Sequence, residues 1–240
     1  MEQGLQKLGE AGLKENADKS FFGRHECEYL RYWVTRTGIH PLVKKVQAIT
    51  NIKTPTTQNH VRSFIGLVNY YRDMWPRRSH MMAPLTKLTS KNVKLKWTDV
   101  EQKAFDKIKR HVAREVLLSY PNFNEEFVIH ADASQTQLGG IISQKGKPVA
   151  FYSRKLSDAQ TRYTTGEREL LSIVETLKEF RTILWGQRIK TYTDHKNLTC
   201  KNIVNDRVLR WRLLLVEYGP DIIYIKGEAN NAADVMSRLL

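Results

Sequence analysis

The chain has 240 residues, which is enough for one large or two small domains, and its hydrophobic fraction of 41% is too high for a disordered protein. It has no apolar run long enough to span a membrane, no signal-peptide pattern in its first residues, and two cysteines, Cys27 and Cys200, which are too few for a disulfide framework; these features predict an intracellular protein with reduced thiols. The 39 basic and 25 acidic residues give a net charge of +14, which favours a polyanionic partner.

The first half of the chain is predicted to be mostly helical. Residues 28–37 are the exception, because β-formers followed by a Thr37-Gly38 turn signal favour an extended hairpin. Helices are predicted, in chain order, over residues 1–19, after Pro41, after Thr56 or Thr57, over residues 79–88, and after a capping box formed by Thr98 and Glu101. We therefore expect residues 1–120 to form a small helical domain with a hairpin.

The second half, residues 121–240, changes character after Pro121. Strands are predicted over residues 127–132, 138–144, 148–153, 189–193 and 221–225. Helices are predicted after a second capping box at Thr164 and Glu167, over residues 208–218, and over residues 231–240. Three antiparallel-looking strands followed by alternating helices and strands predict a mixed five-stranded α/β sheet.

The surplus of positive charge is concentrated in residues 51–100, which hold nine basic and two acidic side chains. A solvated cationic surface is one interpretation of this composition. The interleaved aromatic residues favour contact with a phosphate backbone instead. The candidate nucleic-acid-binding residues are Arg62, Tyr70, Tyr71, Arg72, Arg77, Arg78, Lys94 and Lys96.

Four acidic residues stand out by their position. Asp132 and Asp194 end predicted strands, Glu169 lies on the apolar side of its helix, and Asp234 begins the last predicted helix. Taken singly, each is more often a helix cap or a surface charge. Together, acids beside apolar neighbours indicate a shared cation, and oxygen ligands suit two Mg²⁺ or Mn²⁺ ions rather than zinc.

Four ordered segments of the second half resemble the ribonuclease H domain of gypsy-type LTR retrotransposon polyproteins. The first segment is Asp132-Ala133-Ser134, and the second starts at Tyr163 and contains Glu167-Arg168-Glu169-Leu170-Leu171. The third starts with Thr193-Asp194-His195, and the fourth starts at Asn230 and contains Ala233-Asp234-Val235. Segments of the first half resemble the reverse transcriptase C-terminus of the same family: Glu28-Tyr29-Leu30, the thumb helix from Arg62 to Arg72, and the connecting region at Ala83-Pro84-Leu85-Thr86 and Lys96-Trp97-Thr98.

The resemblance implies a ribonuclease H-like fold over residues 121–240, preceded by a thumb and connection region over residues 1–120. It implies that Asp132, Glu169, Asp194 and Asp234 bind two Mg²⁺ or Mn²⁺ ions and catalyse endonucleolytic cleavage of the RNA strand of RNA–DNA hybrids. Cleavage would leave 5′-phosphate and 3′-hydroxyl ends. Glu169 is assigned rather than Glu167, because the family's catalytic glutamate directly precedes two apolar residues.

The expected partners are an RNA–DNA hybrid, duplex nucleic acid, and an upstream polymerase part of the same polyprotein, without a membrane. The expected location is cytoplasmic, including virus-like particles, or nuclear. The chain carries no Tyr-x-Asp-Asp motif, so we expect it not to polymerise DNA by itself. Arg31 departs from the family, which usually has Gly after Tyr-Leu. A non-catalytic nucleic-acid-binding remnant of a truncated retroelement is therefore kept as the alternative.

Overall fold

The computed structural model describes residues 2–14, 16, 20–90, 92–113, 117–198 and 205–226. The predicted helix over 231–240, with Asp234, lies outside the described residues. Within these ranges, none of the helices is both long enough and apolar enough to cross a membrane.

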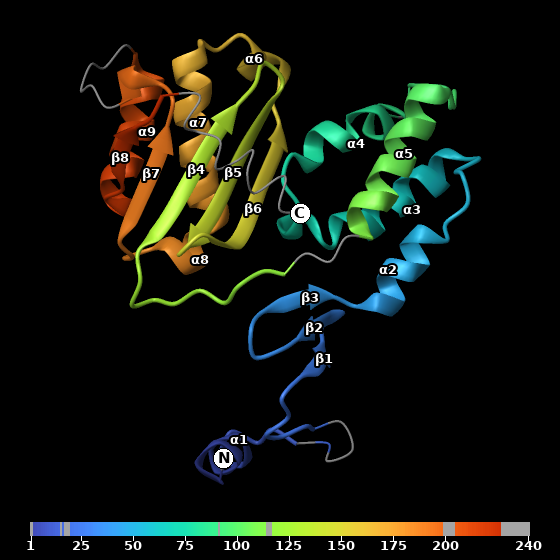
Figure 1. Ribbon diagram of the computed structural model, residues 1–240, viewed down its shortest axis with the longest axis vertical. Coiled ribbons are helices and arrows are strands. Elements are labelled where there is room, and N and C mark those ends of the chain that lie inside the picture. Colours follow the sequence, from blue (N-terminus) through green and yellow to red (C-terminus); the bar gives the residue numbers. More distant parts are fainter. Residues whose placement is uncertain are drawn as a thin grey trace.

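The first half folds as predicted into helices and a small antiparallel sheet (Figure 1). Its elements are α1 (Glu2–Glu10), β1 (Cys27–Tyr29), β2 (Tyr32–Val34), β3 (Ile39–Pro41), α2 (Val43–Thr50), α3 (Gln58–Asn69), the short helix η2 (Arg72–Met74), α4 (Arg78–Lys87) and α5 (Asp99–Val112). Thr57 caps α3 by accepting a hydrogen bond from the His60 amide, and Thr98 and Glu101 form the predicted capping box of α5. We call α2 to α5 with η2 the helical unit.

Two predictions for this half are wrong in their details. Helix α1 ends at Glu10 instead of continuing to residue 19, and Gly12 follows it with a φ of +73°, outside the helical region. The helix predicted after Pro41 is present as α2 but begins only at Val43, because Pro41 is the last residue of a third strand. Ile39 in that strand also pairs with Leu118, a contact with a distant segment that local sequence cannot reveal.

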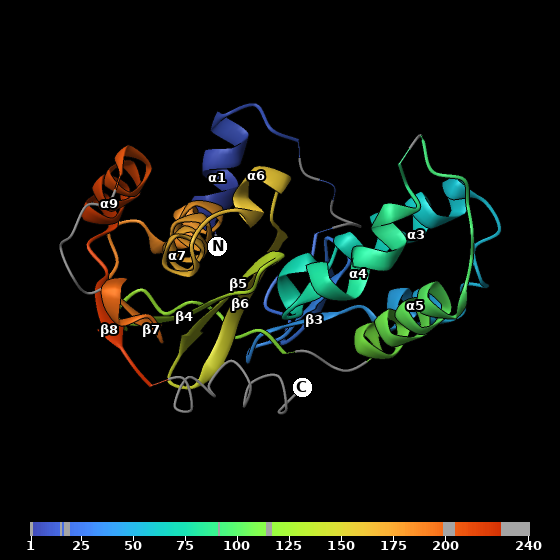
Figure 2. The same cartoon turned by 90° about the horizontal axis from the view of Figure 1, so that it is seen from above.

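The second half contains a five-stranded mixed sheet, which confirms the predicted fold class. Its elements are β4 (Phe127–Ala133), β5 (Gln137–Gln144), β6 (Lys147–Lys155), α6 (Asp158–Thr161), α7 (Thr165–Glu179), α8 (Arg181–Leu184), β7 (Ile189–Thr193), η3 (Lys196–Leu198), α9 (Asp206–Tyr218) and β8 (Asp221–Tyr224). The strand order is β6-β5-β4-β7-β8, with β4 antiparallel to β5 and parallel to β7. Helices α7 and α9 lie on one side of this sheet (Figure 2).

The two faces of the sheet are covered by different parts of the chain. Leu138 and Ile142 of β5 belong to hydrophobic clusters shared with α7, whereas Ile141 belongs to the cluster of the helical unit. Phe151 of β6 joins that second cluster as well. Because side chains alternate along a strand, one face of β5 and β6 packs on α7 and the other on the helical unit. The core of the helical unit is therefore continuous with the sheet.

Candidate active site

Two of the predicted acids lie at the ends of neighbouring parallel strands, Asp132 near the end of β4 and Asp194 directly after β7. The register of β4 and β7 pairs Phe127 with Ile189 and His130 with Tyr192, a constant offset of 62 residues. Continued by two residues, this register brings Asp194 level with Asp132. Parallel strands that end together at one edge of a sheet are where α/β proteins place their sites.

Glu169 reaches the same edge from the opposite layer. It lies on α7, is only 4% exposed, and its Oε1 accepts a hydrogen bond of 3.0 Å from the Ala133 amide, next to Asp132. Its Oε2 is buried and has no hydrogen-bond partner among the residues that the structure describes. Burial, together with the negative charges of Asp132 and Asp194, raises the pKa of Glu169 to about 8. The two aspartates therefore lie close enough to Glu169 to act on its charge.

Ser172, one turn further along α7, fixes the backbone beside Asp132. Its hydroxyl donates to the carbonyl of Asp132 at 3.1 Å and to that of Gly139 at 2.7 Å. These two residues are paired across β4 and β5. The strand that carries Asp132 is thus tied to the helix that carries Glu169.

The donor set fits a divalent cation in its chemistry. Carboxylate oxygens are the ligands that Mg²⁺ and Mn²⁺ prefer, and the unpartnered Glu169 Oε2 is a buried acceptor whose burial is costly unless it gains a positive partner. Among the described residues, however, no group of three His, Cys, Asp or Glu side chains is close enough together to hold a metal ion. Asp132 instead has its Oδ2 4.0 Å from Nη2 of Arg77. The fourth predicted acid, Asp234, lies outside the described residues.

His195, which follows Asp194, lies against the start of α7. Its backbone amide donates to Thr193 Oγ1 at 3.2 Å, and its ring lies against Gly166 at the start of α7. A Cβ atom on Gly166 would lie 2.9 Å from Nε2 of His195, so a larger residue there would require the His195 ring to shift.

Glu167 caps α7 as predicted and has a second role that the sequence did not indicate. Its Oε2 accepts from the Thr164 amide at 2.9 Å, while Oε1 accepts from Asn205 at 2.9 Å and from Arg207 at 2.5 Å. The carboxylate therefore joins α7 to α9. Only the fold brings Arg207 to this helix end, 40 residues along the chain, so local sequence gave no signal for it.

The predicted nucleic-acid-binding residues do not form one uniform surface. Arg62, Tyr70, Arg72, Arg77, Lys94 and Lys96 are exposed. Tyr71 is only 4% exposed and its hydroxyl donates to the Arg31 carbonyl, so its ring is a core residue and not a surface on which a base could stack. Arg78 is half-buried and bonded to Asn69 and to the Ser153 carbonyl, which gives it a structural role instead.

The chain is similar in sequence to known proteins. Residues 97–191 match the family described as "RNase H-like domain found in reverse transcriptase". The chain is 38% identical over 237 residues to the retrovirus-related Pol polyprotein from transposon 297 of Drosophila melanogaster, covering 97% of this chain and 22% of that protein. It is 32% identical over 248 residues to the transposon Tf2-3 polyprotein of Schizosaccharomyces pombe, covering 98% of this chain and 19% of that protein. The chain thus spans about a fifth of the length of these relatives.

Solved structures share the fold. A foamy viral protease-reverse transcriptase in complex with double-stranded DNA superposes with a TM-score of 0.79 at 24% identity, over 94% of this chain and 42% of that one. The foamy viral enzyme in complex with an RNA/DNA hybrid gives a TM-score of 0.76 at 23% identity, over 88% of this chain and 30% of that one. The predicted family is confirmed by these sequence relatives: the chain belongs to the retrotransposon polyproteins and carries the RNase H-like domain of a reverse transcriptase.

Proposed function

We propose that this chain cleaves the RNA strand of RNA–DNA hybrids, as the C-terminal part of a retrotransposon reverse transcriptase. The observation that carries the proposal is the buried Glu169 carboxylate, which has one unpartnered oxygen and a pKa raised by burial and by the charges of Asp132 and Asp194. Perturbed acids that converge from separate elements are typical of catalytic sites.

Asp132, Glu169, Asp194 and Asp234 would hold two Mg²⁺ or Mn²⁺ ions. When bound, such a pair supplies an activated water and stabilises the leaving oxygen of a phosphodiester. The chain's own part is to hold the acids in place. The Ala133 amide orients Glu169, and Ser172 fixes the backbone at Asp132.

The proposed substrate follows from the fold and from the charge. The net charge of +14 suits a phosphate backbone, and a related fold has been solved with an RNA/DNA hybrid bound. The RNA strand would be distinguished by its 2′-hydroxyls in the shallow minor groove. We assign residues 1–120 to the thumb and connection region, residues 121–240 to the ribonuclease H domain, and the upstream polymerase part as partner. An intracellular location, cytoplasmic or nuclear, would follow from this role.

The test compares Asp132→Asn with the unaltered chain on a labelled RNA–DNA hybrid. We expect the substitution to abolish Mg²⁺-dependent cleavage while hybrid binding stays within a few-fold. Asp221→Asn is the control, because Asp221 is an exposed acid of the same sheet at the start of β8. Cleavage by the Asp132→Asn chain at the unaltered rate would refute the assignment.

A non-catalytic nucleic-acid-binding remnant is the second candidate. It is favoured by the absence of a three-ligand group among the described residues and by the contact of Asp132 with Arg77. Titration with Mg²⁺ followed by calorimetry discriminates the two. The nuclease is expected to release or absorb heat in the millimolar range and to lose this signal in Asp132→Asn, whereas a remnant gives the same trace for both chains.

A further inference from the structure

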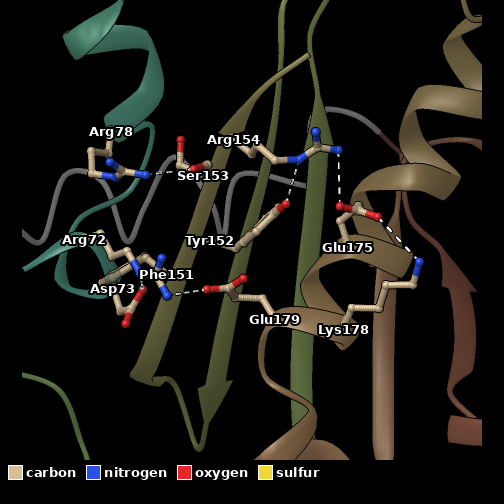
Figure 3. A pocket seen from close by; sticks show the side chains of 10 residues that line it. All are labelled: Arg72, Asp73, Arg78, Phe151, Tyr152, Ser153, Arg154, Glu175, Lys178 and Glu179. Atoms are coloured by element: carbon tan, nitrogen blue, oxygen red, sulfur yellow. Dashed lines mark hydrogen bonds and ion pairs between the residues drawn. The ribbon is translucent and has the colours of Figure 1, made fainter. Parts of the chain in front are cut away.

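The start of α4 is fastened to the sheet beside the proposed active site. The Ser79 amide donates to Ser153 Oγ at 3.0 Å, and the Ser79 hydroxyl donates to Gln137 Oε1 at 2.7 Å. Arg78 donates from Nη2 to the Ser153 carbonyl at 3.3 Å, a contact visible in Figure 3. Three hydrogen bonds therefore fix the first turn of α4 on β5 and β6, so its position does not depend on hydrophobic packing alone.

The strand register explains why the start of α4 lies close to Asp132. Asp132 pairs with Gly139, and Gly139 pairs with Ser153, so the three residues form one row across β4, β5 and β6. Residues directly opposite each other in antiparallel strands share a face of the sheet. Because Ile141, two residues after Gly139, packs in the helical unit's cluster, this row lies on the face that the helical unit covers.

Arg77 is the residue that this anchoring brings to Asp132. It has a φ of +50°, in the left-handed region, and its Nη2 lies 4.0 Å from Asp132 Oδ2. Both side chains are about half exposed, at 56% and 53%. They line an open cavity of about 300 Å³ together with the polar residues His80, Ser134 and Gln137 and the apolar Leu138.

The neighbouring arginines are engaged elsewhere. Arg72 forms an ion pair with Glu179 at 2.6 Å and contacts Asp73, while Arg78 bonds to Asn69 and Ser153. Figure 3 shows Arg72 beside Glu179 and Arg78 bonded to Ser153. The Arg77–Asp132 separation of 4.0 Å is the longest among the ion pairs recorded within the described ranges. An exposed pair at that distance contributes little to stability, so the guanidinium can exchange the carboxylate for another anion.

We propose that Arg77 is a substrate-positioning residue, which holds a phosphate of the RNA strand in the cavity beside Asp132. The planar guanidinium can bind a phosphate with two parallel hydrogen bonds. Because Arg77 lies at the start of α4, this contact would make the helical unit and the sheet one continuous nucleic-acid-binding surface. The inference rests on the proposed function, because it concerns the same site.

The test uses two variants. Arg77→Gly removes the charge, and glycine tolerates the left-handed backbone. Arg77→Lys keeps the charge but cannot bind a phosphate in bidentate fashion. Lys145→Gly is the matched control: Lys145 is also an exposed cation with positive φ (+48°), paired with Glu125, at the other end of β5. Hybrid binding is measured by fluorescence anisotropy in EDTA over a range of salt concentrations, where no cleavage can occur.

We expect Arg77→Gly to weaken hybrid binding about three- to tenfold and to lower the slope of log affinity against log salt by about 0.9, the value for one lost phosphate contact. Arg77→Lys should keep most of that slope, and Lys145→Gly should keep both quantities. A single neutral methylphosphonate can also replace one phosphate of the RNA strand next to the cut. At one position this replacement should weaken hybrid binding by the unaltered chain but not by Arg77→Gly. A purely structural role of Arg77 would not produce this difference.

Two results would overturn the inference. One is an Arg77→Gly chain that binds with the unaltered affinity and salt slope. The other is faster Mg²⁺-dependent cleavage by Arg77→Gly, which would make Arg77 a block on Asp132. The binding arm is independent of catalysis: if the unaltered chain fails to cleave but Arg77→Gly loses the phosphate contact, the nuclease proposal falls and the Arg77 contact stands.

Discussion

The amide of Ala133 donates to one carboxylate oxygen of Glu169, while the other oxygen is buried and has no hydrogen-bond partner within the described part of the chain. The single hydrogen bond fixes where the side chain points. It does not satisfy the charged form, so burial together with Asp132 and Asp194 raises the Glu169 pKa from 4.5 to about 8. A carboxyl held in this way is protonated at neutral pH unless a cation is bound.

The first prediction concerns the stability of the metal-free protein against pH. Between pH 4.5 and 8 the folded state keeps a proton on Glu169 that the unfolded chain releases, so the free energy of unfolding should fall as pH rises through this window and level off above it. Urea unfolding in EDTA measures it. Glu169→Gln should remove this part of the pH dependence, and an unchanged profile in Glu169→Gln would contradict the assigned pKa. Mg²⁺ should also flatten the profile, because the cation favours the ionised form.

The second prediction concerns the contact between β5 and α7. A Cβ atom on Gly140 would lie 2.4 Å from Thr176 Oγ1, and this hydroxyl is held in place by its hydrogen bond to the Ser172 carbonyl at 2.8 Å. Gly140→Ala should destabilise the fold by about 1–3 kcal/mol, the usual cost of overpacking a core.

A matched variant and a rescue make this test sharp. Gly139→Ala meets only ordinary contacts, at 3.7 Å or more, and should be far milder. Adding Thr176→Ala to Gly140→Ala should recover part of the loss, so the two effects are expected to be non-additive in thermal unfolding. Additive losses would mean that the strand and the helix are further apart than the structure has them.

The third prediction concerns the joint between α7 and α9. Although burial alone raises the pKa of Glu167, its hydrogen bonds from Arg207, Asn205 and Thr164 outweigh burial and bring the pKa to about 2. Because the folded pKa is below the unfolded value of 4.5, this stabilisation is present above pH 4.5 and is lost as pH falls toward 2.

Glu167→Gln keeps a residue suited to the capping box but loses the charge that binds Arg207. We expect it to cost about 1–2 kcal/mol at neutral pH, the range for hydrogen bonds to a charged group, and to weaken the loss of stability in acid. Glu101→Gln is the matched control, since Glu101 occupies the same position in the capping box of α5 with hydrogen bonds only to Thr98. Equal losses in the two variants would show that the link to α9 contributes nothing.

The fourth prediction concerns the turn between β1 and β2. Tyr29 pairs with Tyr32, so Leu30 and Arg31 form a two-residue turn, and both have positive φ, +45° and +66°. Such turns favour glycine, so the arginine that stands here in place of the family's usual glycine has a conformational cost. The Arg31 guanidinium lies over the Tyr70 ring at 5.2 Å, and this contact offsets part of that cost.

Arg31→Gly should therefore raise the free energy of unfolding by roughly 0.5 kcal/mol, the difference between about 1–2 kcal/mol of backbone strain and the cation–π contact and chain entropy that are lost. Denaturant midpoints measure the gain. Arg36→Gly, at an exposed residue without positive φ, should lower stability instead. A loss in Arg31→Gly as large as in Arg36→Gly would show that the turn is not strained.

Most local elements of this protein could be predicted from its sequence. The capping boxes at Thr98 and Thr164 and the alternating strands are set by interactions within a few residues, which act the same way in any surrounding structure. The acids Asp132, Glu169 and Asp194 were also singled out by their places on those elements.

Contacts between side chains far apart in the sequence could not be predicted and are known from the tertiary structure. It buried Tyr71, joined Glu167 to Arg207, and set Arg77 beside Asp132. These outcomes depend on strand register and on which layer covers each face of the sheet, and both are set by packing between segments far apart in sequence. A basic residue can be identified from the sequence, but whether it is free to bind a phosphate depends on the partner that the fold gives it.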